Sequence, residues 1–256
     1  MTTGSQPLLS VQDLHHEYSP GAVAIESVSF DVLEGQFLSI VGPSGCGKTT
    51  LMKAIAGLLP PTRGTITFQG KEVKSVPADL AMVFQDYSRS LFPWLSVRAN
   101  VELPLKYHTM GSDERASRIE SSLESVGLVD KGHLFPWQLS GGMQQRVAIA
   151  RALAYRPKIL LMDEPFASVD AQTRSNLEDL VSRVHRESGV TMLFVTHDID
   201  EAVYLADEVV VLSSPPSSVA ERIQVNLGAS RDQIDTKSSS EFVALRAQVA
   251  RLILRP

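Results

Sequence analysis

The sequence of 256 residues predicts an α/β fold with a mainly parallel core sheet, an N-terminal antiparallel β subdomain and an inserted α-helical subdomain. Mostly apolar runs of strand length suit strands that are buried on both faces; they lie at 36–41, 158–163 and 191–197. Alternating segments at 28–32 and 65–68 are typical of antiparallel strands. Helical spacing marks 51–59, which we expect to end at Pro60, and it recurs within 87–155.

We expect a single domain over 1–256 that has three parts. Their approximate bounds are 7–86 and 156–230 for the core, 87–155 for the helical subdomain and 231–256 for a C-terminal helical extension. Ser112, which two acidic residues follow, is a plausible start for a helix of the inserted part. A last amphipathic helix is expected over 241–254, and the segments 208–212 and 222–227 should form a closing hairpin.

Composition and charge exclude several classes of protein. Apolar residues make up 43% and charged residues 21%, which is an ordinary globular balance. The net charge of −5, without a run of Lys or Arg, argues against nucleic acid as a partner. A single cysteine, Cys46, permits no internal disulfide and fits a reducing cytosol. The N-terminus lacks the features of a signal peptide, and no apolar run approaches the ~20 residues that cross a bilayer.

The segment GPSGCGKT at 42–49 matches the phosphate-binding pattern G-x-x-x-x-G-K-[ST]. It follows a predicted strand and precedes a predicted helix, as that pattern requires. Its glycines allow a tight turn whose N–H groups converge on phosphate oxygens at a helix N-terminus. Lys48 would pair with the outer phosphates, and Thr49 would offer its hydroxyl to Mg²⁺. The alternative is a chance glycine turn with a surface lysine, which the two correct flanks disfavour.

Two carboxylates, Asp163 and Glu164, end the apolar run KILLMDEP. Carboxylates at the end of a buried strand destabilise the fold, so their presence there indicates a functional role. Asp163 can hold Mg²⁺, directly or through water, and Glu164 can polarise a water for in-line attack on a γ-phosphate. The alternative is that both merely cap the turn at Pro165.

Three further residues are candidates because of where they stand. Gln85 ends the apolar run AMVFQ, and its neutral amide can ligate Mg²⁺ or a water. His197 follows another apolar run and could donate a hydrogen bond to the γ-phosphate, although a lone histidine there is more often structural. Tyr18 could stack on adenine, although alone it is an ordinary turn tyrosine.

The segment LSGGMQQR at 139–146 predicts a second anion site. Ser140 can donate its hydroxyl, while Gly141 and Gly142 expose backbone N–H groups at the start of a helix. The first turn of that helix lacks the Asp or Glu that normally complements its positive end. An external anion is the natural replacement, so the chain carries two phosphate-binding devices on different lobes.

This ordered set of motifs resembles that of the ABC ATPases, the nucleotide-binding subunits of ATP-binding-cassette transporters, over nearly the whole chain. The resemblance identifies 42–50 as Walker A, 159–164 as Walker B, Ser168 to Asp170 as the D-loop and Gln85 as the Q-loop. It implies that Glu164, His197 and Lys48 are catalytic and that Thr49, Gln85 and Asp163 hold Mg²⁺. The residues it implies for the chain's own ATP are Tyr18, Gly42, Pro43, Ser44, Gly45, Cys46, Gly47, Lys48, Thr49, Thr50 and Gln85. The signature residues implied to contact a partner's ATP are Leu139, Ser140, Gly141, Gly142 and Gln144.

The family's arrangement implies the partners. Two cassettes, here most simply two copies of this chain, pack head to tail, and each signature closes over the ATP of the other. The helical subdomain docks transmembrane permease subunits at the cytoplasmic face of the membrane, and an extracytoplasmic solute-binding protein acts indirectly. Phe92, Pro93 and Trp94 would form an exposed anchor for the permease. The alternative is that these three residues pack inside the lobe.

The segments LFPWLSVRANV and DEPFASVDAQTR resemble the nitrate, sulfonate and taurine importer group. Val169 replaces the usual leucine of the D-loop, and the turn SSPPSS at 213–218 replaces an arginine-containing turn. An ABC exporter subunit and a non-transport ABC ATPase are the alternatives within the class. A GTPase would need N-K-x-D, and no Asn here precedes Lys. Glu164 argues against a binding module without turnover.

Overall fold

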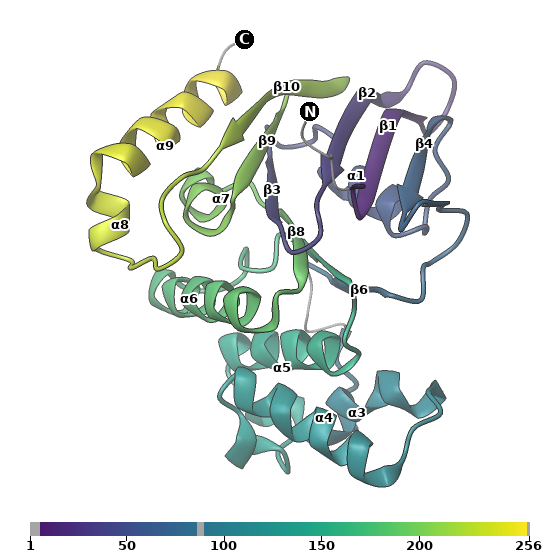
Figure 1. Cartoon of the computed structure of the whole chain (residues 1–256), viewed down its shortest axis with the longest axis vertical. Helices are drawn as coiled ribbons and strands as arrows, with labels where there is room; N and C mark the ends of the chain where they lie inside the picture. The colour runs from purple at the N-terminus through teal and green to yellow at the C-terminus, as the bar shows by residue number, and fades with distance from the viewer. Residues whose placement is uncertain (1–5, 86–89, 255–256) are drawn as a thin grey trace.

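The computed structural model describes residues 6–85 and 90–254, and these build one large mixed sheet flanked by helices (Figure 1). The order of the described strands is β5-β4-β1-β2-β10-β9-β3-β8-β7-β6. Their bounds are β1 Leu9–Glu17, β2 Val23–Val32, β3 Phe37–Val41, β4 Arg63–Phe68, β5 Lys71–Glu72, β6 Leu80–Val83, β7 Ile159–Asp163, β8 Thr191–Val195, β9 Glu208–Leu212 and β10 Ser217–Gln224.

The sheet combines two kinds of pairing. Strands β9, β3, β8, β7 and β6 are parallel neighbours. Strands β1, β2, β4 and β5 form an antiparallel patch, and β10 joins it to the parallel part by pairing with β2 and β9. The predicted α/β architecture, with a mainly parallel core and an N-terminal antiparallel subdomain, is confirmed.

Helices cover the sheet and build a separate lobe (Figure 1). Their bounds are α1 Lys48–Ile55, α3 Val97–Glu102, α4 Ser112–Ser125, α5 Gly141–Ala154, α6 Ala171–Ser188, α7 Ile199–Leu205, α8 Asp235–Ser238 and α9 Ser240–Ile253. Short 3-10 helices lie at η1 Leu103–Tyr107, η2 Val129–Lys131 and η3 Pro136–Gln138. Helices α3, α4 and α5 gather at one end of the molecule, and α5 packs on α6.

The central strands bury side chains on both faces, as their unbroken apolar runs predict. On β3, Phe37 and Val41 join the core on one face of the sheet, whereas Leu38 and Ile40 join the core on the other. The first core continues without a break into the helical lobe, where it includes Leu123 of α4. The lobe is therefore held to the sheet by shared apolar packing.

Several boundaries differ from the sequence-based expectation for local reasons. Helix α1 ends at Ile55 instead of reaching Pro60, because Gly57 adopts φ +70° and the N–H of Leu58 bonds back to the carbonyl of Lys53. Strand β6 ends at Val83, before Gln85. Helix α4 begins at Ser112 but its N-cap is Gly111, and no side chain caps it. The closing hairpin is confirmed as the antiparallel pair β9 and β10, but its second strand spans Ser217–Gln224 instead of 222–227.

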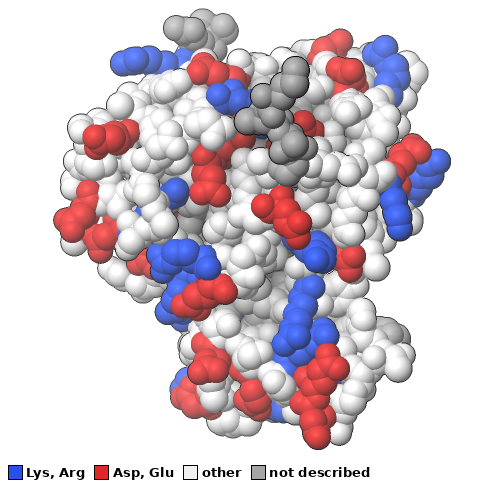
Figure 2. Space-filling view, in the orientation of Figure 1, with Lys and Arg blue, Asp and Glu red and all other residues white. Residues whose placement is uncertain are grey.

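The surface and the helix lengths bear on possible partners. Figure 2 shows basic and acidic side chains interspersed over the described part of the face in view. Across 6–85 and 90–254, no helix combines the length and apolar character needed to span a bilayer.

Candidate nucleotide site

The phosphate loop lies between β3 and α1, as the sequence predicts. Gly45 and Gly47 adopt φ +79° and +88°, a region that side chains disfavour. A Cβ on Gly47 would also lie 3.1 Å from the carbonyl oxygen of Ala24, so glycine is required there. Helix α1 has neither a side-chain cap nor an acidic residue in its first turn. Its free N–H groups therefore favour an anion from outside the chain.

Lys48 lies inside the loop. Its side chain is buried, and Nζ donates to the carbonyl oxygens of Gly42 at 2.9 Å and Pro43 at 3.0 Å. These bonds hold the ammonium under the loop, where a phosphate can replace the carbonyl oxygens as its partner. Cys46 is also buried, and burial raises the pKa of its thiol.

Asp163 ends β7 and is 3% exposed. The Thr49 hydroxyl bonds to the carboxyl group, whereas Oδ1 has no hydrogen-bond partner among the described residues. Burial raises the pKa of this carboxyl group. A buried oxygen without a partner fits a cation ligand. No group of three acidic, His or Cys side chains gathers within the described residues to cage a metal. Mg²⁺ is commonly bound by one or two carboxylates, waters and substrate phosphates.

Glu164 is the centre of a cluster that includes two other predicted residues. Its Oε2 accepts from Gln85 Nε2 at 3.3 Å and lies 3.0 Å from His197 Nδ1. The carboxylate therefore serves this cluster rather than capping the turn at Pro165. Glu164 has φ +44°, a conformation rare outside glycine, and strain of this kind often marks functional sites. The His197 side chain is 56% exposed, so its ring can reach a ligand.

Tyr18 stands beside the first turn of α1. Its hydroxyl lies 2.7 Å from Thr50 Oγ1, and the residue is 63% exposed. The edge of the ring packs on His16, whose centroid lies 4.8 Å away. Tyr18 is thus fixed at its hydroxyl end and has exposed ring surface for a planar ligand. The contact with Thr50 was not predicted, because it joins segments that are 32 positions apart in the sequence.

The signature segment forms the start of α5. Ser140 is its N-cap: Oγ accepts from the Met143 N–H at 3.4 Å, which leaves the hydroxyl proton free to donate. No acidic residue lies in the first turn. Gln144 donates to the carbonyl oxygens of Pro136 at 3.0 Å and Leu139 at 3.3 Å, so it braces the segment. Gly141 is exposed and Gly142 is buried.

The D-loop segment leads into α6. Asp170 is the N-cap of this helix, and its carboxylate accepts from the N–H and the hydroxyl of Thr173 at 3.0 and 2.7 Å. Ser168 is exposed. Within the described residues, no hydrogen bond or ion pair joins 139–144 to the phosphate loop at 42–50. The helix starts at α1 and α5 are thus separate, and both lack an acidic residue in the first turn.

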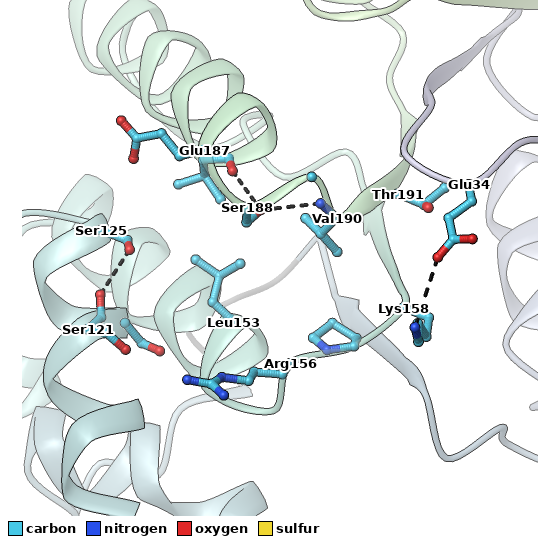
Figure 3. A pocket seen from close by; sticks show the side chains of 14 residues that line it. Glu34, Ser121, Ser125, Leu153, Arg156, Lys158, Glu187, Ser188, Val190 and Thr191 are labelled. Atoms are coloured by element: carbon cyan, nitrogen blue, oxygen red, sulfur yellow. Dashed lines mark hydrogen bonds and ion pairs between the residues drawn. The ribbon is translucent and has the colours of Figure 1, made fainter. Parts of the chain in front are cut away.

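The hollow in Figure 3, about 530 Å³, is not part of this site. It opens beside Lys158 and Thr191, at the start of β7 and β8, whereas Asp163 and His197 follow the opposite ends of these strands. Ligand sites of open parallel sheets lie at the carboxyl ends of the strands. None of the predicted site residues lines this hollow.

The predicted aromatic anchor lies on the surface. Trp94 is 69% exposed and its ring meets that of Phe92 edge-on, with centroids 5.3 Å apart. Phe92 and Pro93 are also exposed, so the three do not pack inside the lobe. Asn100 fixes the turn by donating to the carbonyl oxygens of Phe92 and Leu95. The preceding segment 86–89 lies outside the described residues.

The fold and the phosphate loop between β3 and α1 define a P-loop ATPase with a separate helical lobe. The family model described as "ABC transporter" matches residues 25–167. The chain is 43% identical over 246 residues to the taurine import ATP-binding protein TauB of Yersinia pestis, covering 94% of this chain and 95% of that one. It is 39% identical over 255 residues to the nitrate transport protein NasD of Klebsiella oxytoca, covering 97% of each.

Solved structures agree with the sequence relatives. CbiO1 from Clostridium perfringens, described as part of an ABC transporter complex, is 29% identical with a TM-score of 0.78, over 86% of this chain and 89% of that one. A dimeric ATP-binding cassette in a post-hydrolysis state with ADP and phosphate is 32% identical with a TM-score of 0.73, over 85% of this chain and 99% of that one. The chain belongs to the ABC transporter family and is an ATPase.

Proposed function

We propose that this ATPase drives solute uptake as the nucleotide-binding subunit of an importer in the nitrate, sulfonate and taurine group. The cluster of Glu164, Gln85 and His197 beside the phosphate loop carries the proposal for the reaction. The taurine and nitrate relatives, similar over nearly their whole length, support import and the solute group. The exposed Phe92 and Trp94 support a docking surface for a separate permease at the cytoplasmic face of the membrane.

The site binds ATP from three sides. The N–H groups of the loop and the Lys48 ammonium hold the phosphates, and the exposed ring of Tyr18 stacks on adenine. Thr49, Gln85 and Asp163 would hold Mg²⁺, which would neutralise charge on the phosphates. The unpaired Oδ1 of Asp163 supports the metal assignment.

Glu164 acts as the general base. Its carboxylate accepts a proton from a water as the water oxygen bonds to the γ-phosphorus, and the bond to the β–γ bridging oxygen breaks. The bridging oxygen leaves with ADP, and the γ-phosphoryl group becomes inorganic phosphate. The doubly protonated ring of His197 orients Glu164 through Nδ1–H, which lies 3.0 Å from the carboxylate, and donates to the γ-phosphate through Nε2–H.

The signature acts on a second cassette. Ser140, Gly141 and Gly142 bind the γ-phosphate of ATP held by a second copy, and ATP closes the two subunits head to tail. Ser168 and Asp170 line the same interface. The dimeric cassette among the structural relatives supports this arrangement. A solute-binding protein would deliver the cargo to the permease, and nucleic acid has no part in the cycle.

Replacement of Glu164 by Gln tests the assignment, because Gln keeps the size of the side chain but cannot accept the proton. We expect ATP binding to persist and kcat to fall by roughly 10²–10⁴-fold. The matched control is Glu187→Gln, which removes an equal charge from the exposed end of α6. Wild-type turnover in Glu164→Gln would show that another group is the base.

A further inference from the structure

Arg174 lies on the second turn of α6 and contacts the segment that carries His197. Its Nη1 donates to Asp198 Oδ2 at 3.3 Å, and its Nε lies 3.4 Å from Glu201 Oε1. Asp198 directly follows His197 in the chain and is the N-cap of α7, where its Oδ1 accepts from the N–H groups of Asp200 and Glu201. One guanidinium therefore contacts both carboxylates at the start of α7.

The residue on the other side of His197 belongs to the same network. The Thr196 hydroxyl donates to Glu201 Oε2 at 2.6 Å and accepts from the Asp198 N–H at 3.0 Å. Thr196 and Glu201 are buried. Both chain neighbours of His197 are thus fixed, although the His197 side chain itself is mostly exposed.

The charges explain why Arg174 is needed at this point. Asp198 and Glu201 belong to one helix turn and share a single guanidinium. Burial raises the pKa of Glu201 to about 7, so its ionised form is costly there. Without Arg174, Asp198 loses the cation that it faces, so its carboxylate, whose side chain is 30% exposed, gains hydration by shifting outward. A shift of Asp198 carries His197 with it, because the two residues are adjacent.

We propose that Arg174 is a positioning residue for ATP hydrolysis, which holds the His197 ring against Glu164 through Asp198 and Glu201. The inference rests on the proposed roles of Glu164 and His197. Arg174 touches neither ATP nor the reacting water in this role. Its loss should therefore lower turnover and leave nucleotide affinity unchanged.

The first experiment compares Arg174→Met with Tyr204→Phe. The Tyr204 hydroxyl makes another α6–α7 contact, donating to Asp179 Oδ1 at 2.7 Å, and within 6–85 and 90–254 it has no hydrogen bond to Thr196 or Asp198. We expect kcat for Arg174→Met to fall on the order of 10- to 100-fold, because small displacements of catalytic groups have effects of this size. ATP affinity should stay within about two-fold, and Tyr204→Phe should keep wild-type kcat. Equal losses in both variants would overturn the proposal.

Two further variants separate positioning from a general loss of stability. Asp198→Asn keeps the oxygen that caps α7 and removes the charge that faces Arg174, so we expect a partial loss of kcat in a folded protein. In a His197→Ala background, Arg174→Met should lower kcat no further, because it acts through His197. Additive losses would show that Arg174 acts elsewhere.

An NMR measurement on the full chain without nucleotide tests the geometry apart from catalysis. The ring signals of His197, assigned by their disappearance in His197→Ala, should move in Arg174→Met and stay in place in Tyr204→Phe. If the ring signals of His197 stay in place in both variants, Arg174 does not position His197, whatever the kinetic results. If the signals move but His197→Ala retains wild-type kcat, Arg174 positions His197 but His197 has no catalytic role.

Discussion

The contact between the signature glycine Gly142 and Thr173 allows a quantitative prediction. A Cβ placed on Gly142 would lie 2.3 Å from Thr173 Cγ2, whereas carbon atoms in contact are ordinarily ~3.5–4.0 Å apart. Thr173 cannot rotate away freely, because its hydroxyl donates to Asp170 at 2.7 Å. Gly142→Ala must therefore displace α5 from α6.

We expect this overpacking to cost about 1–3 kcal/mol, partly offset by up to about 1 kcal/mol from the better helix propensity of alanine. A net cost of about 1–2 kcal/mol lowers the melting temperature by roughly 2–8 °C for a domain of this size, at about 2–4 °C per kcal/mol. The Thr173→Ser background removes Cγ2 but keeps the hydroxyl, and the next nearest atom, Thr173 Cβ, lies at an ordinary 3.7 Å. In the Thr173→Ser background, Gly142→Ala should leave the melting temperature unchanged or raise it.

Thermal unfolding of the four proteins, followed by circular dichroism, measures this coupling. An equal fall in melting temperature in both backgrounds would refute the predicted collision with Thr173. ATPase assays of the same proteins should show activity lost in Gly142→Ala and largely restored by Thr173→Ser, because the second change relieves the displacement of α5.

Two other predictions concern charged groups. Lys48→Ala should weaken nucleotide binding by roughly 10- to 100-fold, as expected for loss of a charged hydrogen bond. The control Lys53→Ala, on the exposed side of α1, should leave the affinity unchanged. Unchanged affinity for Lys48→Ala in an equilibrium titration would contradict the assignment of the phosphate loop. Burial raises the pKa of Glu201 from 4.5 to about 7, so the folded chain retains a proton that the unfolded chain releases. This contribution to stability is complete below about pH 4.5 and is lost as the pH rises through 7. Unfolding free energy should therefore fall by roughly 2–3 kcal/mol from pH 5 to pH 8, and a denaturant titration of Glu201→Gln should lack that fall.

The parts of the fold that the sequence predicted have strong local patterns. The strands β3, β7 and β8 are buried on both faces, and the phosphate loop combines glycines with a fixed lysine position. The strand β1 was not predicted. Its alternation is interrupted at Asp13, which has φ +47° at a shift in strand register, so two exposed residues stand side by side.

The candidate site was predicted as a set of residues but not as a set of contacts. Gln85, Glu164 and His197 follow three different strands, and only the strand order brings them together. Arg174 has no local signal, since an arginine on the second turn of a helix is ordinary. Its partners are 24 and 27 positions later in the chain, and only the packing of α6 on α7 makes them neighbours.

The most direct test of the shared-site ATPase is the solution mass of Glu164→Gln with and without Mg-ATP. We predict a monomer without nucleotide and a dimer with Mg-ATP, because ATP held by Lys48 and its loop joins the signature of a second copy and is not hydrolysed. Ser140→Arg, which blocks the cradle but leaves the phosphate loop intact, should bind ATP and stay monomeric in the same background. A Glu164→Gln protein that binds Mg-ATP and remains monomeric would contradict closure between two copies of this chain.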